Sequence, residues 1–231
     1  MRLKLHFCAF FATIVWSDPT PAEDYLPLFL GNHWEYDSVG GNHENQDVED
    51  TMTIWGHEVY VIRYHESTDN EGLENYWTTQ SDGDVELWGY HRTLDGFGAV
   101  YDPPILLVDA PPYLGKTWSQ EIDYYSYPGL VYTGTFEIGF EVYEEGWVSV
   151  PAGEFFAYGI GQALPPGIPL GVRLDGSVGD IQAAGEPWEW WSANVGQVQY
   201  GGNDLYQLSL YGLPTPIRTM SWGQIKVAIV Y

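Results

Sequence analysis

The sequence predicts an all-β protein whose strands form one strongly curved antiparallel sheet, either a half-barrel or a sandwich-like arrangement, with very little helix. Runs rich in Val, Ile, Thr, Tyr, Phe and Trp recur between clusters of Gly, Pro, Asn and Asp, which is the pattern of strands and turns. No stretch beyond the N-terminal region sustains an apolar period of 3.6 residues, and 27 Gly with 15 Pro disfavour long helices. A hydrophobic content of 45% is ample for a packed core.

The N-terminal residues 1–22 are expected to be a cleavable signal peptide. Residues 1–4 include the basic Arg2 and Lys4, residues 5–16 form an apolar run, and small residues at 20 and 22 place the cut after Ala22. A retained anchor is the alternative, but the apolar run is shorter than the roughly 20 residues that span a bilayer. We therefore expect an exported protein, periplasmic, on the outer surface or extracellular. Cleavage would also remove Cys8, the single cysteine, which excludes disulfides and thiolate sites.

Strands are then expected along the rest of the chain, in a single β domain over 23–212 that is followed by a linker or tail at 213–231. The region 133–142 shows the clearest alternation, with apolar side chains on one face and Glu or Gly on the other. Closely spaced turns make antiparallel neighbours, and we expect a monomer. The predicted strands are 33–38, 50–54, 58–65, 73–79, 85–90, 105–108, 117–124, 133–142, 147–150, 155–162, 186–192, 195–200 and 204–211.

The charge of the chain restricts its partners. Eight basic residues stand against 32 acidic ones, for a formal net charge of −24. Such a chain repels nucleic-acid phosphates and anionic membrane surfaces, so neither class of partner is expected. The acidity has three readings that the sequence leaves open: solubility, a saline habitat in which repulsion is screened, and cation binding.

Four short motifs occur in a fixed order along the chain: PLFLGNHWEY at 27–36, GKTW at 115–118, VPAGEF at 150–155 and WWSANVGQV at 190–198. Together they resemble a group of bacterial secreted β-rich proteins with P-L-x-x-G-x-x-W-x-Y, G-K-x-W, V-P-A-G-x-F and W-x-x-x-x-V-G-x-V motifs. The resemblance implies a strongly curved antiparallel sheet akin to the half-barrels of lipoprotein carriers, and it implies no particular activity.

Tryptophan richness suggests a binding surface, and Trp188, Trp190 and Trp191 are the predicted ligand-binding residues. Their rings could stack on a carbohydrate or line an apolar site, whereas the alternative is that they fill the interior of a curved sheet. Strand alternation would put Trp188 and Trp190 on one side and Trp191 on the other.

Calcium is the one cofactor that the sequence suggests. The alternating oxygen ligands of Asp82, Asp84 and Glu86 suit this ion, although they complete no known calcium loop. The five histidines beyond the signal peptide fall in separate predicted elements, which favours individual roles over a zinc site. They are His33, His43, His57, His65 and His91.

No catalytic motif of the nucleophile-elbow, zinc-protease or phosphate-loop type occurs after the signal peptide. The sequence therefore favours a binding function over an enzymatic one without excluding an enzyme. The leading hypothesis is an exported, non-enzymatic protein, structural or a binding module for an apolar ligand or a protein partner. The alternatives are a carbohydrate-binding or glycoside-hydrolysing protein that uses surface Trp and acidic residues, and a calcium-stabilised surface or adhesion protein.

Overall fold

A computed structural model describes residues 22–66, 70–163, 187–201 and 205–212. These residues form strands and turns and contain no helix, so none of them belongs to a helix that could cross a membrane. The all-β class and the antiparallel arrangement are therefore confirmed. The predicted signal peptide, apart from its last residue Ala22, and the predicted tail at 213–231 lie outside the described residues.

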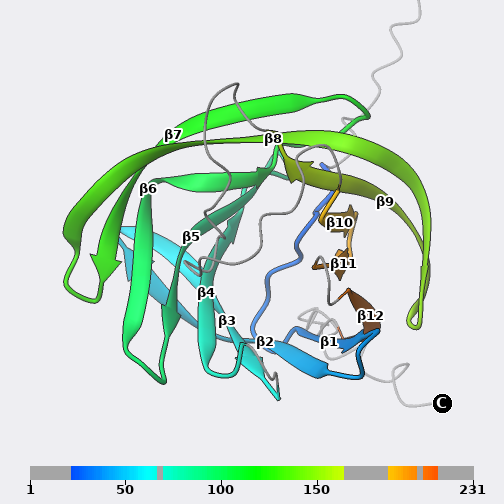
Figure 1. The fold of residues 1–231 in the computed structure, drawn as a ribbon, viewed down its shortest axis with the longest axis horizontal. Helices are drawn as coiled ribbons and strands as arrows, with labels where there is room; N and C mark the ends of the chain where they lie inside the picture. The colour runs from blue at the N-terminus through cyan, green and yellow to red at the C-terminus, as the bar shows by residue number, and fades with distance from the viewer. Residues whose placement is uncertain (1–21, 67–69, 164–186, 202–204, 213–231) are drawn as a thin grey trace, which may run out of the picture.

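Consecutive strands pair antiparallel all the way around, and β1 also pairs with β12, so the sheet closes into a barrel (Figure 1). The sheet thus goes further than the predicted half-barrel, because its curvature is sufficient for closure. The strands are β1 His33–Ser38, β2 His43–Ile54, β3 His57–His65, β4 Leu73–Thr79, β5 Val85–Arg92, β6 Phe97–Val108, β7 Thr117–Tyr127, β8 Val131–Val150, β9 Gly153–Gln162, β10 Glu189–Ser192, β11 Gly196–Tyr200 and β12 Tyr206–Gly212.

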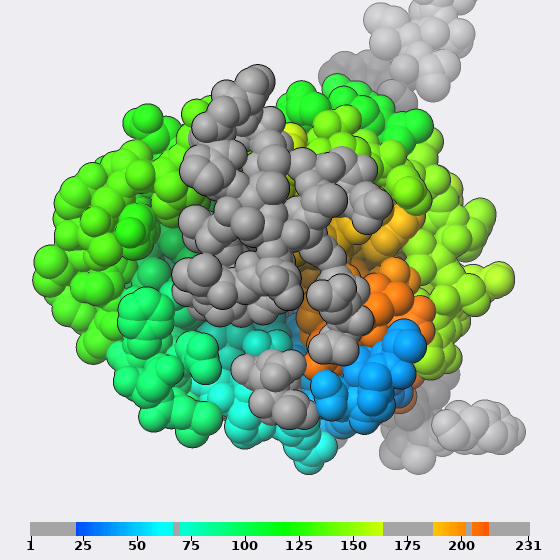
Figure 2. All heavy atoms as spheres, in the orientation of Figure 1, coloured from blue at the N-terminus to red at the C-terminus, as the bar shows by residue number. Residues whose placement is uncertain are grey.

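Closure occurs where the first strand meets the last. Trp34 pairs with Tyr211 and Ser38 with Tyr206, with a bulge between Glu35 and Tyr36. In Figure 2 the orange residues of β12 lie beside the blue residues of β1. Each described strand therefore has a neighbour on both sides, and none of them is an edge strand of the sheet.

Aromatic side chains fill much of the barrel interior. Trp34, Tyr36, Tyr90, Phe140 and Trp191 are each at most 2% exposed and belong to one continuous core. Full burial of one such side chain stabilises a fold by roughly 1.5–3 kcal/mol. The predicted alternation in 133–142 is confirmed, since Ile138, Phe140 and Val142 are buried and Phe136 packs against the same core.

One end of the barrel is closed by residues 22–32, which we call the strap; it is the blue coil that crosses the ring in Figure 1. Tyr25, Leu26 and Leu28 of the strap are buried in the core. The strap is fixed on three sides: the Asn194 N–H donates to the Asp24 carbonyl, the Thr79 hydroxyl to the Leu26 carbonyl, and the Gly31 N–H to the Val48 carbonyl. Gly31 has a φ of +88°, a conformation that glycine adopts readily.

Three strands are at least seven residues longer than any strand predicted there. β8 is one strand of 20 residues instead of two, because a bulge between Val142 and Glu144 absorbs the break in alternation. β6 begins at Phe97 and continues through Pro103 and Pro104, two residues that would suggest a loop. The strand accommodates them because its pairing with β5 shifts register between Val100 and Ile105. The first half of β2 is polar in sequence and was not expected to be a strand.

Candidate functional site

The three predicted ligand-binding tryptophans occupy different environments. Trp191 is 2% exposed and packs in the core 6.3 Å from the ring of Trp77. Trp188 and Trp190 are partly buried against that core, and Trp190 lies over Gly159, where a Cβ atom would be 3.2 Å from its ring. Only Trp188 and Trp190 therefore keep surface for a ligand, and their binding role remains a prediction.

The three predicted calcium ligands each have a protein partner. Asp84 accepts a 2.7 Å hydrogen bond from the Ala110 N–H, which ties the β4–β5 turn to the loop after β6. Asp82 accepts from the Asp84 N–H, and Glu86 accepts from the side chains of Thr78 and Gln80. These contacts give the three carboxylates structural roles, and a calcium role for them remains a prediction.

Sequence reasoning missed a carboxylate inside the barrel. Glu44, on the polar first half of β2, is fully buried. It accepts hydrogen bonds from the Gln46 and Asn70 amides, both at 2.9 Å, and from the Tyr200 hydroxyl. These three donors are uncharged. The signal that could have found Glu44 is its place two residues before Gln46 and four before Val48, because all three then face the same side of a strand.

A second interior carboxylate, Glu189, lies at the start of β10. The Trp191 indole donates a 2.9 Å hydrogen bond to it, and the Gln197 amide also contacts it. Burial raises the pKa of Glu189 to about 7. The two hydrogen bonds favour the charged form and lower this pKa, but burial has the larger effect. Burial above all raises the pKa of the Tyr36 hydroxyl, followed by Tyr64 and then by Glu44 and Glu189, so both carboxylates act on the same interior hydroxyl.

No basic side chain among the described residues balances these two carboxylates. The Lys and Arg residues in the described ranges pair elsewhere: Arg63 with Glu49 and Glu74, Arg92 with Asp95, and Lys116 with Asp109. The interior polar cluster is therefore acidic, and uncharged donors hold its carboxylates. A buried charge without an opposite charge requires such hydrogen bonds.

A pocket of about 460 Å³ lies beside the strap at the closed end of the barrel. Its volume is within the range of small-molecule sites. Burial raises the pKa of Asp24, although the Leu26 N–H donates to its carboxylate at 3.1 Å and favours the charged form. Glu23 accepts a 2.6 Å hydrogen bond from the Tyr25 hydroxyl. The described lining residues are Ala22, Glu23, Asp24, Leu28, Tyr60, Thr79, Gln80, Ser81 and Gly83.

Gly83 shows how closely the strap approaches the β4–β5 turn. Its φ is +98°, and a Cβ atom there would lie 2.3 Å from the Glu23 carbonyl oxygen. Only glycine fits this contact, so the turn and the strap together form one wall of the pocket.

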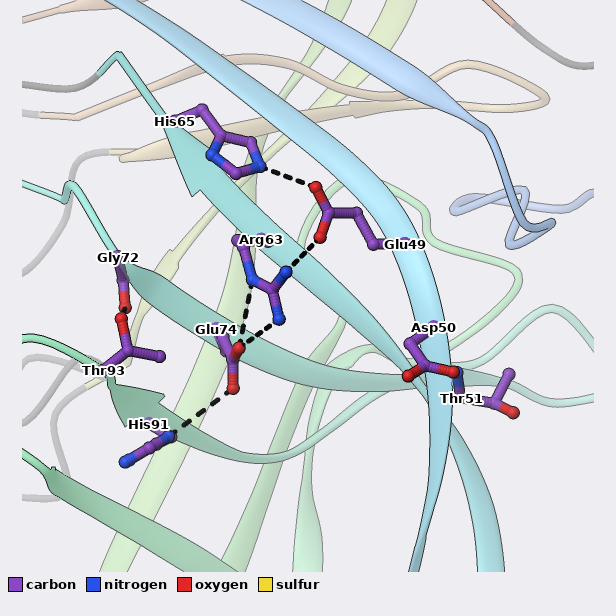
Figure 3. A network of polar contacts seen from close by, with 9 residues as sticks. All are labelled: Glu49, Asp50, Thr51, Arg63, His65, Gly72, Glu74, His91 and Thr93. Atoms are coloured by element: carbon purple, nitrogen blue, oxygen red, sulfur yellow. Dashed lines mark hydrogen bonds and ion pairs between the residues drawn. The ribbon is translucent and has the colours of Figure 1, made fainter.

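Charged side chains of alternating sign form a row across β1 to β5. Cross-strand pairing aligns His33 with Asp47, Asp47 with Arg63, Arg63 with Glu74, and Glu74 with His91. Figure 3 shows Arg63 between Glu49 and Glu74, with His65 on Glu49 and His91 on Glu74. Opposite charges at paired positions stabilise neighbouring strands.

Within this row the structure brings together residues that could hold a metal ion. The ligand atoms of Asp47, Glu49 and His65 all lie within 4.8 Å of one another. His33 and His65 belong to different strands, as predicted, but β1 and β3 place them on either side of β2; the prediction of individual roles over a zinc site stays a prediction. The pairing of strands that are distant in sequence supplies this proximity.

Comparisons with known proteins give distant structural likenesses. A proposed exported protein with a YmcC-like fold from Bacteroides fragilis is 15% identical, with a TM-score of 0.44, over 83% of this chain and 100% of its own. A proposed lipoprotein from Parabacteroides distasonis is 16% identical, with a TM-score of 0.36, over 84% of this chain and 100% of its own. No family model and no curated protein matches the chain, so the family that the four motifs suggest remains a prediction.

Proposed function

We propose that this protein is an exported, non-enzymatic binding module, and that its ligand is a small molecule with an ammonium group held in the pocket beside the strap. The observation that carries the proposal is the lining of that pocket, which combines the carboxylates of Glu23 and Asp24 with the polar side chains of Thr79, Gln80 and Ser81.

Charge and hydrogen bonding favour an amine. Each of the two carboxylates has one oxygen bonded within the strap, by Tyr25 or by the Leu26 N–H, so each is oriented and retains a second oxygen as an acceptor. The described lining residues include no Lys or Arg to neutralise them. An ammonium group supplies the missing positive charge and up to three donors. The net charge of −24 also attracts cations toward the protein.

The interior of the barrel fits an apolar ligand less well. Its large side chains are packed together, and its carboxylates Glu44 and Glu189 already accept hydrogen bonds from neighbouring side chains. The pocket, by contrast, is concave and open to solvent at residues such as Glu23. We therefore assign the ligand to the strap pocket.

A pair of matched compounds tests the proposal. Putrescine and 1,4-butanediol have the same carbon chain, and only the first carries ammonium groups. We expect putrescine to raise the melting temperature of the protein and the diol to leave it unchanged, because ligands that bind only the native state stabilise it. The shift should disappear in Asp24→Asn and persist in Asp37→Asn, which alters an exposed acid on β1. An equal shift in both variants, or none with the wild type, would refute the assignment.

A second candidate is carbohydrate binding at an exposed aromatic series on the β8–β9 hairpin. Trp147 is 75% exposed and contacts Phe156, which contacts Tyr158, with ring centroids 5.8 and 5.7 Å apart. Two carboxylates, Glu23 and Glu145, lie near the Tyr158 hydroxyl. Aromatic rings beside carboxylates are suited to sugars. Retardation of the protein in a polysaccharide-containing native gel, lost in Trp147→Ala and kept in Trp55→Ala, would support it; equal retardation of both variants would not.

A further inference from the structure

Four side chains from three neighbouring strands converge around residue 47 in the charged row. Asp47 and Glu49 come from β2, His65 from β3 and His33 from β1. We propose that Asp47, Glu49 and His65 bind a divalent transition-metal ion of the zinc type, and that His33 positions Asp47 for it. This site is separate from the strap pocket and does not depend on its ligand.

The distances suit a small ion. The three ligand atoms lie within 4.8 Å of one another, and the His65 Nε2 is 2.8 Å from the Glu49 Oε1. Zinc binds carboxylate oxygen and imidazole nitrogen at about 2.0–2.2 Å, so its ligand atoms stand somewhat over 3 Å apart in a tetrahedral site. A short movement of exposed side-chain ends reaches that arrangement, because the three residues are each about one-third exposed.

The backbone of β2 places Glu49 for this role. Val48 pairs with Ile62 and Asp50 with Val61, so Glu49 is the extra residue of a β-bulge and has no partner on β3. A bulge bends its strand and re-aims the side chain that it carries. Here the Glu49 carboxylate reaches His65, which the ladder pairs with Asn45, four residues before Glu49.

Neighbouring side chains hold the ligands in orientation and leave atoms free for the ion. His33 Nδ1 lies 2.7 Å from Asp47 Oδ1, and its Nε2 lies 3.0 Å from Glu35 Oε1, so both ring nitrogens are engaged and the second oxygen of Asp47 is available. Arg63 bonds the Glu49 Oε2, so the Oε1, which lies 2.8 Å from His65 Nε2, is the oxygen that faces the proposed ion (Figure 3). Such outer contacts orient metal ligands in known sites.

The ligand set selects the class of ion. Calcium takes six to eight oxygen ligands, whereas zinc binds both imidazole nitrogen and carboxylate oxygen and can hold water in the fourth position of an open site. The two negative charges match a divalent ion. Arg63, held between Glu49 and Glu74, offsets part of that attraction, so we expect reversible binding to the folded barrel without a requirement of metal for folding.

Calorimetric titration of the untagged full chain with zinc chloride tests the proposal. We expect one ion per chain, at least tenfold weaker binding in His65→Ala and in Asp47→Asn, and unchanged binding in His43→Ala. His43 is the matched control, because it also pairs with an aspartate, Asp37 at 2.8 Å, in the adjoining β1–β2 hairpin. Far-UV circular dichroism of each variant verifies the fold.

Cobalt(II) gives a second readout that does not depend on affinity. A four-coordinate site with one imidazole would give visible absorption bands of the bound ion, and these should be lost in His65→Ala and kept in His43→Ala. Wild-type affinity in His65→Ala, equal weakening in His43→Ala, or calcium displacing zinc at equal concentration would each overturn the proposal.

Discussion

The Trp34 indole nitrogen donates a 2.7 Å hydrogen bond to the carbonyl oxygen of Val195, and both residues are buried. The bond joins β1, the first strand, to the turn between β10 and β11. Tyr36 makes a parallel connection two residues later, since its hydroxyl donates to the Gln197 carbonyl at 2.8 Å. These two side chains belong to the first of the four sequence motifs, and they link strands across the barrel interior instead of forming a ligand surface.

Trp34→Phe should lower the free energy of unfolding by about 2–4 kcal/mol, because it removes buried ring volume and leaves the Val195 carbonyl without its donor. Urea denaturation measures the loss. Trp147→Phe is the control. Because Trp147 is 75% exposed, this substitution should lower the free energy of unfolding by less than about 0.5 kcal/mol. Similar losses in the two variants would contradict the structural role given to Trp34.

Gly83→Ala should detach the strap from the β4–β5 turn. Its Cβ would lie 2.3 Å from the Glu23 carbonyl oxygen, and alanine is also strained at a φ of +98°. Gly41→Ala separates the two effects, because Gly41 has a similar φ of +88° with open space around it. We expect the free energy of unfolding to fall by about 1 kcal/mol in Gly41→Ala and by at least about 2 kcal/mol in Gly83→Ala. Thermal unfolding checks the ranking, and equal losses would mean that the strap does not approach Gly83.

Glu189 should make the protein less stable as the pH rises. Burial raises the pKa of Glu189 in the folded state to about 7, above its ordinary value of 4.5. Folding therefore favours the protonated carboxyl, and its stabilising contribution is full below about pH 4.5 and lost as the pH approaches and passes 7. Because the side chain is partly exposed, we expect a difference of about 2 kcal/mol at most between pH 5 and pH 8.

Glu189→Gln removes that titration and retains an acceptor for the Trp191 indole. Urea denaturation at the two pH values should show a smaller loss of stability toward pH 8 in Glu189→Gln than in the wild type. Glu121→Gln, at an exposed position on β7, should behave as the wild type does. An unchanged pH dependence in Glu189→Gln would mean that the carboxyl is better solvated than its surroundings indicate.

Arg63→Met should weaken the charged row at its centre. The substitution leaves Glu49 and Glu74 facing each other without the guanidinium, but the row is partly exposed, so a loss of about 1 kcal/mol is expected at low salt. The loss should shrink in 1 M NaCl as the charges are screened. Arg92→Met, which removes an exposed pair with Asp95 at 3.6 Å, should stay within about 0.5 kcal/mol.

Most strands are predictable because their inward positions are apolar. Trp34 and Tyr36 on β1 and the alternating residues of 133–142 carry this signal, and the structure buries them. The signal fails on the first half of β2, whose inward residues include Glu44 and Gln46. A strand whose inward side chains are polar has no alternating hydrophobic pattern, so its local sequence cannot be distinguished from that of a loop.

The candidate sites were less predictable, because each depends on residues that are distant in sequence. The strap pocket joins Glu23 and Asp24 to Thr79 and Gln80, and the proposed metal site joins His65 to Asp47 across a strand pair. The acidic composition predicts cation binding only in general terms, and local spacing predicts only the run of Asp82, Asp84 and Glu86. Only the register of the strands identifies which acids and histidines are neighbours.

The pairing of β1 with β12 also constrains the order in which the molecule can assemble. Neighbouring hairpins can form as soon as both of their strands exist, but β1 lacks one partner until the final described strand has been made. Contacts of such long sequence separation are the slow step of β-topologies. Ring closure therefore follows synthesis of nearly all of the described chain, and until then β1 and the last strand formed each expose a row of unpaired backbone N–H and C=O groups.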